Sequence, residues 1–202
     1  MKFNIAKTGG VKAELVFEDR LDTEFVKALA EKEVFSGKAE EVYFSMNEKF
    51  ECNLLIGLGK EENIEFDMLR KTFFKVAEVL LKNKVAEVEL NIPKLNNLCN
   101  YKLAEAIAEG LLHATYKFDK FKSEKKETPE LIVNYNPIPG KEHRAEKGID
   151  EAKKLIESIF LTRDLVNQPA NVIYPETLAD ITKERLEAKG VKVTVYGKKE
   201  IE

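Results

Sequence analysis

The sequence has little cysteine and little histidine, and it has no excess of one charge. Only Cys52 and Cys99 occur in 202 residues, far apart and without a CxxC partner, so no disulfide framework or redox pair is indicated and a reducing compartment fits. We interpret Cys52, inside the apolar stretch CNLLIGLG, as a small buried hydrophobic residue rather than a reactive thiol. Neither cysteine is assigned a role.

Positive and negative charges nearly cancel, with 33 Lys and Arg against 36 Asp and Glu and a net charge of -3. This balance gives no electrostatic reason to bind nucleic acid or an anionic membrane. The sequence also lacks a run of ~18 apolar residues, and its start lacks the apolar core of a signal peptide. We therefore expect a globular cytoplasmic protein with no nucleic-acid partner and no membrane partner.

The sequence contains only two histidines. His113 stands in EGLLHATY and His143 in a charged connector, and neither belongs to an HExxH pair or to a cluster at metal-ligand spacing. No serine stands in a G-x-S-x-G elbow that could use a histidine as base. The sequence therefore predicts no catalytic residue, no cofactor-binding residue and no metal ligand.

The stretch IGLGKEE, Ile56 to Glu62, is a glycine-containing loop after a predicted strand, a context in which backbone N–H groups can bind phosphate. A dinucleotide-binding fingerprint would need glycine where Glu62 stands, and a P-loop would need serine or threonine where Glu61 stands. A plain turn after a strand is the favoured interpretation.

The run YKFDKFKSEKK, Tyr116 to Lys126, mixes aromatic and basic residues as single-strand nucleic-acid binders do. Acidic neighbours, among them Asp119 and Glu124, weaken that interpretation. We expect a solvated helix end running into a loop, with Phe118 and Phe121 tucked inward.

Period-two alternation marks the first elements. MKFNIA and VKAELVF flank Gly9 and Gly10 and predict two strands paired through a turn. Asp22 is the expected N-cap of a helix over TEFVKALAEK, followed by strands over EVYFSM and ECNLLIGLG, the second of them fully buried.

Helical periodicity then alternates with strands. DMLRKTFFKVAEVLLKN predicts an amphipathic helix capped by Asp67, with an apolar stripe of Leu69, Phe73, Val76, Ala77 and Leu80. A strand over VAEVELNI, a helix over YKLAEAIAEGLLHATYKF with Leu103, Ile107 and Leu111 in register, and a strand over ELIVNY follow. This order predicts an α/β fold, a three-layer sandwich with helices on both faces of a mixed sheet.

Residues 139–202 are expected to connect the N-terminal domain to a further domain. The Pro- and Gly-containing stretch NPIPGKEHRAEKG reads as a surface connection, and a long helix from about Ala145 must stop before Pro169. Pro175 begins a helix with Leu178, Ile181 and Leu186 on one side and Gly190 as terminator, and VKVTVYG is predicted as a strand. We predict an N-terminal domain over 1–138, a connector and linker helix over 139–168, and the start of a further domain over 169–202.

Three stretches together resemble the leucyl aminopeptidase (cytosol aminopeptidase) family of two-metal exopeptidases: LLIGLGK, LAEAIAEGLLHATYKFDKFKS and TRDLVNQPANVIYPETLAD. The third is the most specific, and Tyr174 stands there where the family usually has Thr. The residues that match the family pattern are Arg163, Asp164, Asn167, Pro169, Asn171, Pro175 and Glu176.

The resemblance implies a small α/β domain similar to macro domains, joined by a long helix to a catalytic domain that binds two divalent metals, zinc or manganese. The family's Lys-Gly-x-Thr-Phe-Asp-Ser-Gly-Gly and Asn-Thr-Asp-Ala-Glu-Gly-Arg tracts do not occur between Met1 and Glu202. We therefore expect a non-catalytic N-terminal domain that packs, assembles and shapes access to the active site of a parent enzyme removing N-terminal residues from peptides. The chain alone is expected to be inactive.

The expected partner is the missing catalytic domain. The family usually forms hexamers, whereas this chain is expected to be a monomer or a weak dimer through the apolar face of the Leu178 helix. The alternative is a stand-alone macro-like module that binds ADP-ribose or a nucleotide near Gly57 and Gly59.

Overall fold

The computed structural model describes residues 1–95, 98–124 and 130–201. Its backbone contacts divide the chain into two compact units, Met1–Ser158 and Ile159–Glu202. Each unit is described by itself. None of the described helices is both long enough and apolar enough to cross a membrane.

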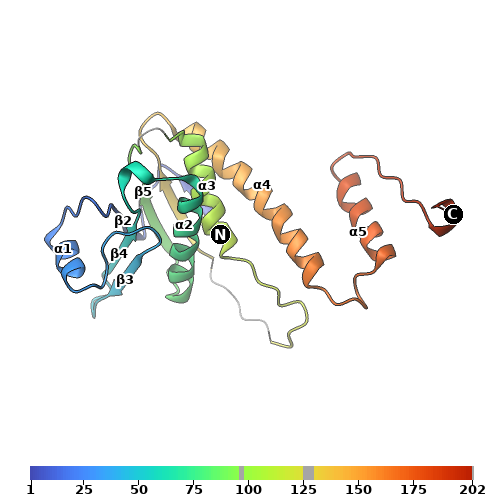
Figure 1. Ribbon diagram of the computed structural model, residues 1–202, viewed down its shortest axis with the longest axis horizontal. Coiled ribbons are helices and arrows are strands. Elements are labelled where there is room, and N and C mark those ends of the chain that lie inside the picture. The colour runs from blue at the N-terminus through green and yellow to red at the C-terminus, as the bar shows by residue number, and fades with distance from the viewer. Residues whose placement is uncertain (96–97, 125–129, 202) are drawn as a thin grey trace. The chain divides into compact units, whose positions relative to one another are not determined.

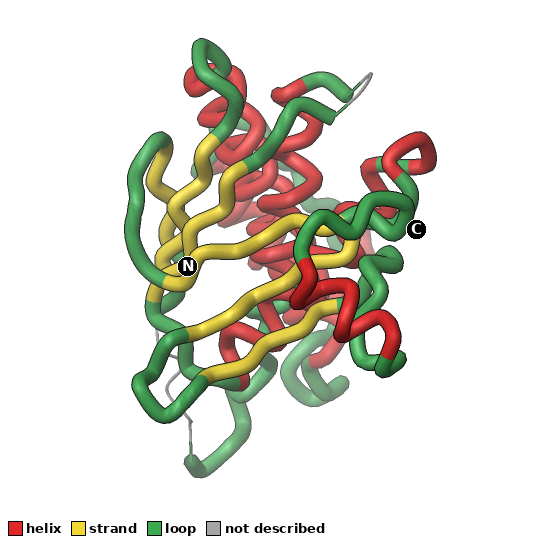
Figure 2. The backbone as a smooth tube through the Cα atoms, turned by 90° about the vertical axis from the view of Figure 1, so that its left-hand side faces the viewer, coloured by secondary structure: helices red, strands yellow, loops and turns green. Residues whose placement is uncertain are grey.

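The first unit is built on a six-stranded sheet in the order β1-β6-β5-β2-β4-β3. Figure 2 shows its strands side by side, with helices packed against them. All neighbouring strands pair in parallel except β3, which runs antiparallel to β4. The sheet is therefore mixed, as predicted. The strands are β1 Lys2–Ile5, β2 Val11–Val16, β3 Val42–Met46, β4 Cys52–Gly57, β5 Glu87–Asn91 and β6 Ile132–Asn136.

Helices lie on both faces of this sheet, which confirms the three-layer α/β fold (Figure 1). Helix α1 (Glu24–Glu31) covers one face and buries a small cluster that includes Val26, Leu29 and Leu55. Helices α2 (Phe66–Lys82) and α3 (Asn100–His113) pack on the other face over the larger core. A short 3₁₀ helix, η1 (Glu61–Asn63), precedes α2.

The predicted helix stripes are the ones that the fold buries. The stripe of α2 from Leu69 to Leu80 and the three apolar residues of α3 are all at most 2% exposed. The two helices approach so closely at Gly110 that an added Cβ would lie 2.4 Å from the carbonyl oxygen of Arg70. Glycine at this position therefore permits the α2–α3 contact, because any side chain would push the backbones apart.

Helix α4 (Glu142–Asn167) is the long helix that the sequence predicts, and it ends before Pro169. Its first half belongs to the first unit and buries Ala145, Ile149 and Ala152 in the main core. At Gly148 an added Cβ would lie 2.2 Å from the carbonyl oxygen of Tyr101, so α4 rests closely on α3. The domain limits at 138 and 168 stay a prediction about the parent protein.

The predicted pairing of the first two strands is wrong. β1 and β2 run parallel in the sheet, and β6 and β5 lie between them. A hairpin needs antiparallel neighbours. Residues 6–10, which link β1 to β2, instead cross β6 and β5 on the sheet face that carries α1, in the part of that face that α1 does not cover. Gly10 lies so close to β5 that a Cβ would be 2.3 Å from the carbonyl oxygen of Glu87.

Polar side chains of the sheet hold this crossing. Gly9 donates its N–H to Glu89 (3.0 Å), and its carbonyl accepts from the side chain of Asn134 (3.1 Å). The fully buried Asn134 also donates to Glu87 (2.7 Å) and accepts from Asn4 (2.9 Å). The buried backbone of the crossing thus finds the partners that it needs.

Two of the predicted helix caps are also wrong. Thr23, not Asp22, caps α1, because its hydroxyl accepts from the N–H of Val26 at 3.2 Å. The N-cap position of α2 is Glu65, and Asp67 lies in the first turn, paired with Arg70 at 2.8 Å. The helix predicted to run to Phe118 ends at His113.

The second unit contains the end of α4, α5 (Pro175–Glu187) and α6 (Lys198–Ile201). Pro175 is the first residue of α5, as predicted, and Gly190 takes a positive φ of 79° beyond its end. The stretch VKVTVYG is not a strand in the described part of the chain. A strand requires a hydrogen-bonded neighbour, and none pairs with this stretch there.

Candidate functional site

The described residues contain no group of three or more His, Cys, Asp or Glu side chains placed to hold a metal ion. His113 ends α3, with its ring 6.2 Å from that of Phe74. His143 lies at the start of α4, 3.9 Å from a carboxylate oxygen of Glu146. The two histidines thus belong to separate local environments, and the prediction that the chain has no catalytic residue remains a prediction.

The glycine loop after β4 has its backbone donors in use. The N–H groups of Gly57, Leu58 and Gly59 donate to the carbonyl oxygens of Glu41, Val16 and Gly37 at 2.8–2.9 Å. An added Cβ on Gly57 would lie 2.1 Å from the carbonyl oxygen of Lys38. These glycines therefore allow backbones to pack closely, and their three N–H groups are not available to a phosphate.

The basic aromatic run follows α3 without helical structure as far as Glu124, and Lys125 and Lys126 lie outside the described residues. The rings of Phe118 and Phe121 meet edge to face with centroids 5.8 Å apart. Phe121 is 55% exposed, so the expectation that both rings are tucked inward is wrong for Phe121. The two rings stabilise each other beside solvent instead.

Both cysteines are free thiols. Cys52 is half-buried, and its Sγ lies 3.7 Å from the carbonyl oxygen of Phe50. Cys99 is exposed directly before α3, where the backbone N–H groups of Lys102 and Tyr101 lower the pKa of its thiol. A helix N-terminus stabilises a thiolate in this way.

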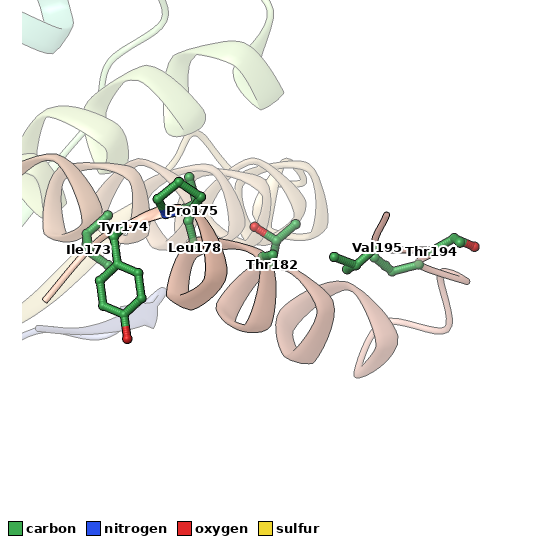
Figure 3. A pocket seen from close by; sticks show the side chains of 9 residues that line it. Ile173, Tyr174, Pro175, Leu178, Thr182, Thr194 and Val195 are labelled. Carbon is green, nitrogen blue, oxygen red and sulfur yellow. The ribbon is translucent and has the colours of Figure 1, made fainter. Parts of the chain in front are cut away.

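An apolar groove of about 670 Å³ runs along α5 in the second unit (Figure 3). The start of α5 is fixed locally. The N–H of Tyr174 donates to the hydroxyl of Thr177 (3.0 Å), and that hydroxyl donates to the carbonyl of Val172 (2.9 Å). The lining comes from α5 and the segments on either side of it: Ile173, Tyr174, Pro175, Leu178, Ala179, Thr182, Val193, Thr194 and Val195.

The groove is unusual because large apolar side chains remain exposed around it. Leu178 is 41% exposed and Leu186 40%, while Val191 and Val195 are about half exposed. Contiguous apolar surface of this kind marks an interaction site in a stable protein. We call the set formed by the groove lining, Leu186 and Val191 the α5 surface.

Sequence periodicity identified part of this surface. Leu178 and Leu186 are exposed, whereas Ile181 is half-buried. Helical spacing does not identify Ile173, Tyr174 and Thr182 as part of the groove, because the first two precede the helix and a polar threonine is not part of an apolar stripe.

A second hollow, of about 630 Å³, lies in the first unit beside the β3–β4 hairpin. Met46 and Phe50 of the hairpin line it and are 56% and 79% exposed. The stretch EVYFSM is predicted as a strand, and it carries no charged residue between Val42 and Met46, which form β3 at the edge of the sheet.

On the open face of the sheet, hydrogen bonds from the side chain of Asn91 and from the N–H of Gly9 lower the pKa of Glu89. Both bonds favour the ionised carboxylate. The carboxylate therefore helps to hold the crossing of residues 6–10 at neutral pH.

Comparison with sequence families gives a match over residues 8–125 to the cytosol aminopeptidase family, N-terminal domain. A probable cytosol aminopeptidase of Treponema denticola is 72% identical over 202 residues, covering 100% of this chain and 42% of that protein. The corresponding protein of Clostridium tetani is 38% identical over 206 residues, covering 100% of this chain and 43% of its own length. The chain thus spans less than half the length of these relatives.

Solved structures show the same fold. The bottromycin maturation enzyme BotP superposes with a TM-score of 0.75 at 21% identity, over 96% of this chain and 40% of that one. A tomato leucine aminopeptidase mutant superposes with a TM-score of 0.74 at 18% identity, over 94% and 43% of the respective chains. At these identities the likeness concerns the fold alone.

Proposed function

Because this chain belongs to the cytosol aminopeptidase family and carries its N-terminal domain, we propose that it is the non-catalytic part of a two-metal aminopeptidase. The parent enzyme removes N-terminal residues from peptides. The observation that carries this proposal is the 72% identity to a probable cytosol aminopeptidase along the whole of this chain.

The described residues do not fit a two-metal centre. Such a centre needs several deprotonated side chains that converge on both ions, and no group of three candidate ligands occurs among them. We therefore assign the two divalent ions, zinc or manganese, to the part of the parent that this chain does not span.

We assign to the α5 surface the role of contacting that remaining part. The surface exposes Leu178 and Leu186 on a well-capped helix, and covering one large apolar side chain stabilises a protein by roughly 1.5–3 kcal/mol. The partner is thus a catalytic domain that presents a complementary apolar surface. Without it, the chain is a monomer or a weak dimer, whereas the parent forms the hexamer usual in the family.

The charge balance and the two thiols bear on the parent's location and on its partners. The near balance of 33 basic and 36 acidic residues offers no attraction to nucleic acid or to anionic lipid. A cytoplasmic location agrees with this balance and with the two free thiols. No observation favours the alternative of a module that binds ADP-ribose, because the N–H groups near Gly57 and Gly59 are already bonded.

Complementation tests the proposal. The chain alone, supplied with zinc or manganese, should not hydrolyse a leucyl amide above background. Mixed with the part of the Treponema denticola relative that it does not match, it should form a complex with metal-dependent activity. Turnover by the chain alone that a chelator abolishes and that survives removal of contaminating peptidases would overturn the proposal.

A matched pair of variants tests the surface. Leu178→Asp places a charge in the groove and should weaken the complex at least about tenfold, because burying an unpaired carboxylate is costly. Lys183→Asp is the control, since Lys183 is exposed on the same helix and does not line the groove. Equal effects of the two variants would refute the role of the α5 surface.

A further inference from the structure

Strand β3 forms one end of the sheet, and the outer side of its backbone is open. The N–H of Gly57 donates to the carbonyl of Glu41 (2.8 Å), and the N–H of Asn47 donates to the carbonyl of Glu51 (3.0 Å). Bonding alternates along an antiparallel strand, so the odd-numbered residues between them also face β4. The N–H and C=O groups of Val42, Phe44 and Met46 therefore point away from the sheet. Within the described residues, these groups have no hydrogen-bond partner.

This edge lacks the features with which proteins usually prevent edge pairing. Charged residues, proline, bulges and very short strands are the common protections. β3 reads Val-Tyr-Phe-Ser-Met, without charge or proline, and its register with β4 is unbroken from Val42 to Met46. The opposite edge strand, β1, is shorter and carries Lys2. Only the β3 edge is thus suited to accept another strand.

We propose that β3 pairs antiparallel with the β3 of a second copy of this chain, about a two-fold axis at Phe44, and joins two sheets into one. In this register Phe44 faces Phe44 and Val42 faces Met46, and each facing pair exchanges two backbone hydrogen bonds. The strand is complementary to itself because all of these residues are apolar. A second copy is therefore the occupant that this sequence fits.

The flanking residues explain why the association is weak. Glu40 and Glu48 lie in turns on either side of β3, and Glu40 is already paired with Lys75 at 2.9 Å, which limits the repulsion between the two copies. A five-residue strand forms a small interface, and interfaces below about 1,200 Å² are typical of transient association. The dimer would cover part of the exposed Met46, which is 56% exposed in the single chain.

Amide hydrogen exchange gives a signature that only edge pairing produces. At about 20 µM the amides of Val42, Phe44 and Met46 should exchange quickly, whereas those of Tyr43 and Ser45, bonded to β4, should be protected. At about 1 mM, where a weak dimer is populated, the first three should become protected too. Unchanged exchange at these three amides while the mass measured by light scattering doubles would overturn the proposal.

Three variants separate edge pairing from general stickiness. Met46→Pro removes an outward N–H that the single chain does not use, and should raise the dimer dissociation constant at least about tenfold. Phe50→Ser removes the more exposed neighbouring side chain outside the strand, and should change the constant less than about twofold. Leu178→Asp should also leave it unchanged. A dimer that survives Met46→Pro, or one lost equally with Phe50→Ser or Leu178→Asp, would show that another surface makes the contact.

Discussion

Removing the side-chain amide of Asn134 should be the most costly single polar substitution on the open face of the sheet. The fully buried amide donates to the carbonyl of Gly9 (3.1 Å) and to Glu87 (2.7 Å), and it accepts from Asn4 (2.9 Å). Each bond contributes about 1 kcal/mol net, and buried partners left unpaired add to the loss. Asn134→Ala should therefore lower the free energy of unfolding by about 3 kcal/mol.

The matched control is Asn136→Ala, on the same strand and the same face. Asn136 is half-buried and donates to Asn91 at 3.0 Å, so its loss should cost less than about 1 kcal/mol. In urea, a slope of about 2 kcal/mol per molar converts the expected Asn134 effect into a midpoint lower by about 1.5 M. Exchange of the Val88 and Leu90 amides in β5 reports the first unit alone. If Asn134→Ala is no more destabilising than the control, the network does not hold the crossing.

Three further outcomes follow from local contacts. Gly148→Ala should lower stability by about 1–3 kcal/mol, because a Cβ 2.2 Å from the carbonyl of Tyr101 outweighs a gain in helix propensity of about 1 kcal/mol; an unchanged thermal midpoint would contradict this. Hydrogen bonds hold the pKa of Glu89 below its ordinary value of 4.5, so its contribution to stability is complete above that value and is lost as pH falls through the lower folded-state pKa. Glu89→Gln should therefore be less stable than the wild type at about pH 6 but not at about pH 2, and a difference that persists in acid would argue against the carboxylate. Cys99 should react with iodoacetamide about tenfold faster than Cys52 at neutral pH, since its thiol is exposed and has the lowered pKa; equal rates measured by mass spectrometry would refute this.

Sequence patterns predicted the elements of the first unit well where one face is buried. The helix stripe from Leu69 to Leu80 and the residues Leu103, Ile107 and Leu111 in the next helix require only that apolar residues recur with the helical period. Both helix stripes lie in the core that the pattern implies. Caps were predicted less well, because Asp22 and Thr23 are equally suitable types and only the backbone geometry selects Thr23.

Sequence patterns predicted only part of the candidate site. No side chain in the sequence was proposed as a ligand or nucleophile, and the face with Leu178 and Leu186 was recognised from helical spacing. The full groove needed the structure, because Ile173 and Val193–Val195 come from outside α5 and meet it only through the turns at its two ends. The family resemblance rests on three stretches, of which TRDLVNQPANVIYPETLAD is the most specific, and composition and periodicity cannot supply it.

The sequence by itself determined the order of strands and helices in the first unit, the buried faces of α2 and α3, and the membership in a family of known layout. These properties depend on residues close together in the chain. The tertiary structure alone decided that β1 and β2 are separated by β6 and β5, that residues 6–10 cross the sheet, and that β3 is left at an edge. Strand order depends on hydrogen bonds and core contacts between segments as far apart as Asn4 and Asn134. A local pattern does not encode which of several suitable strands will be the neighbour.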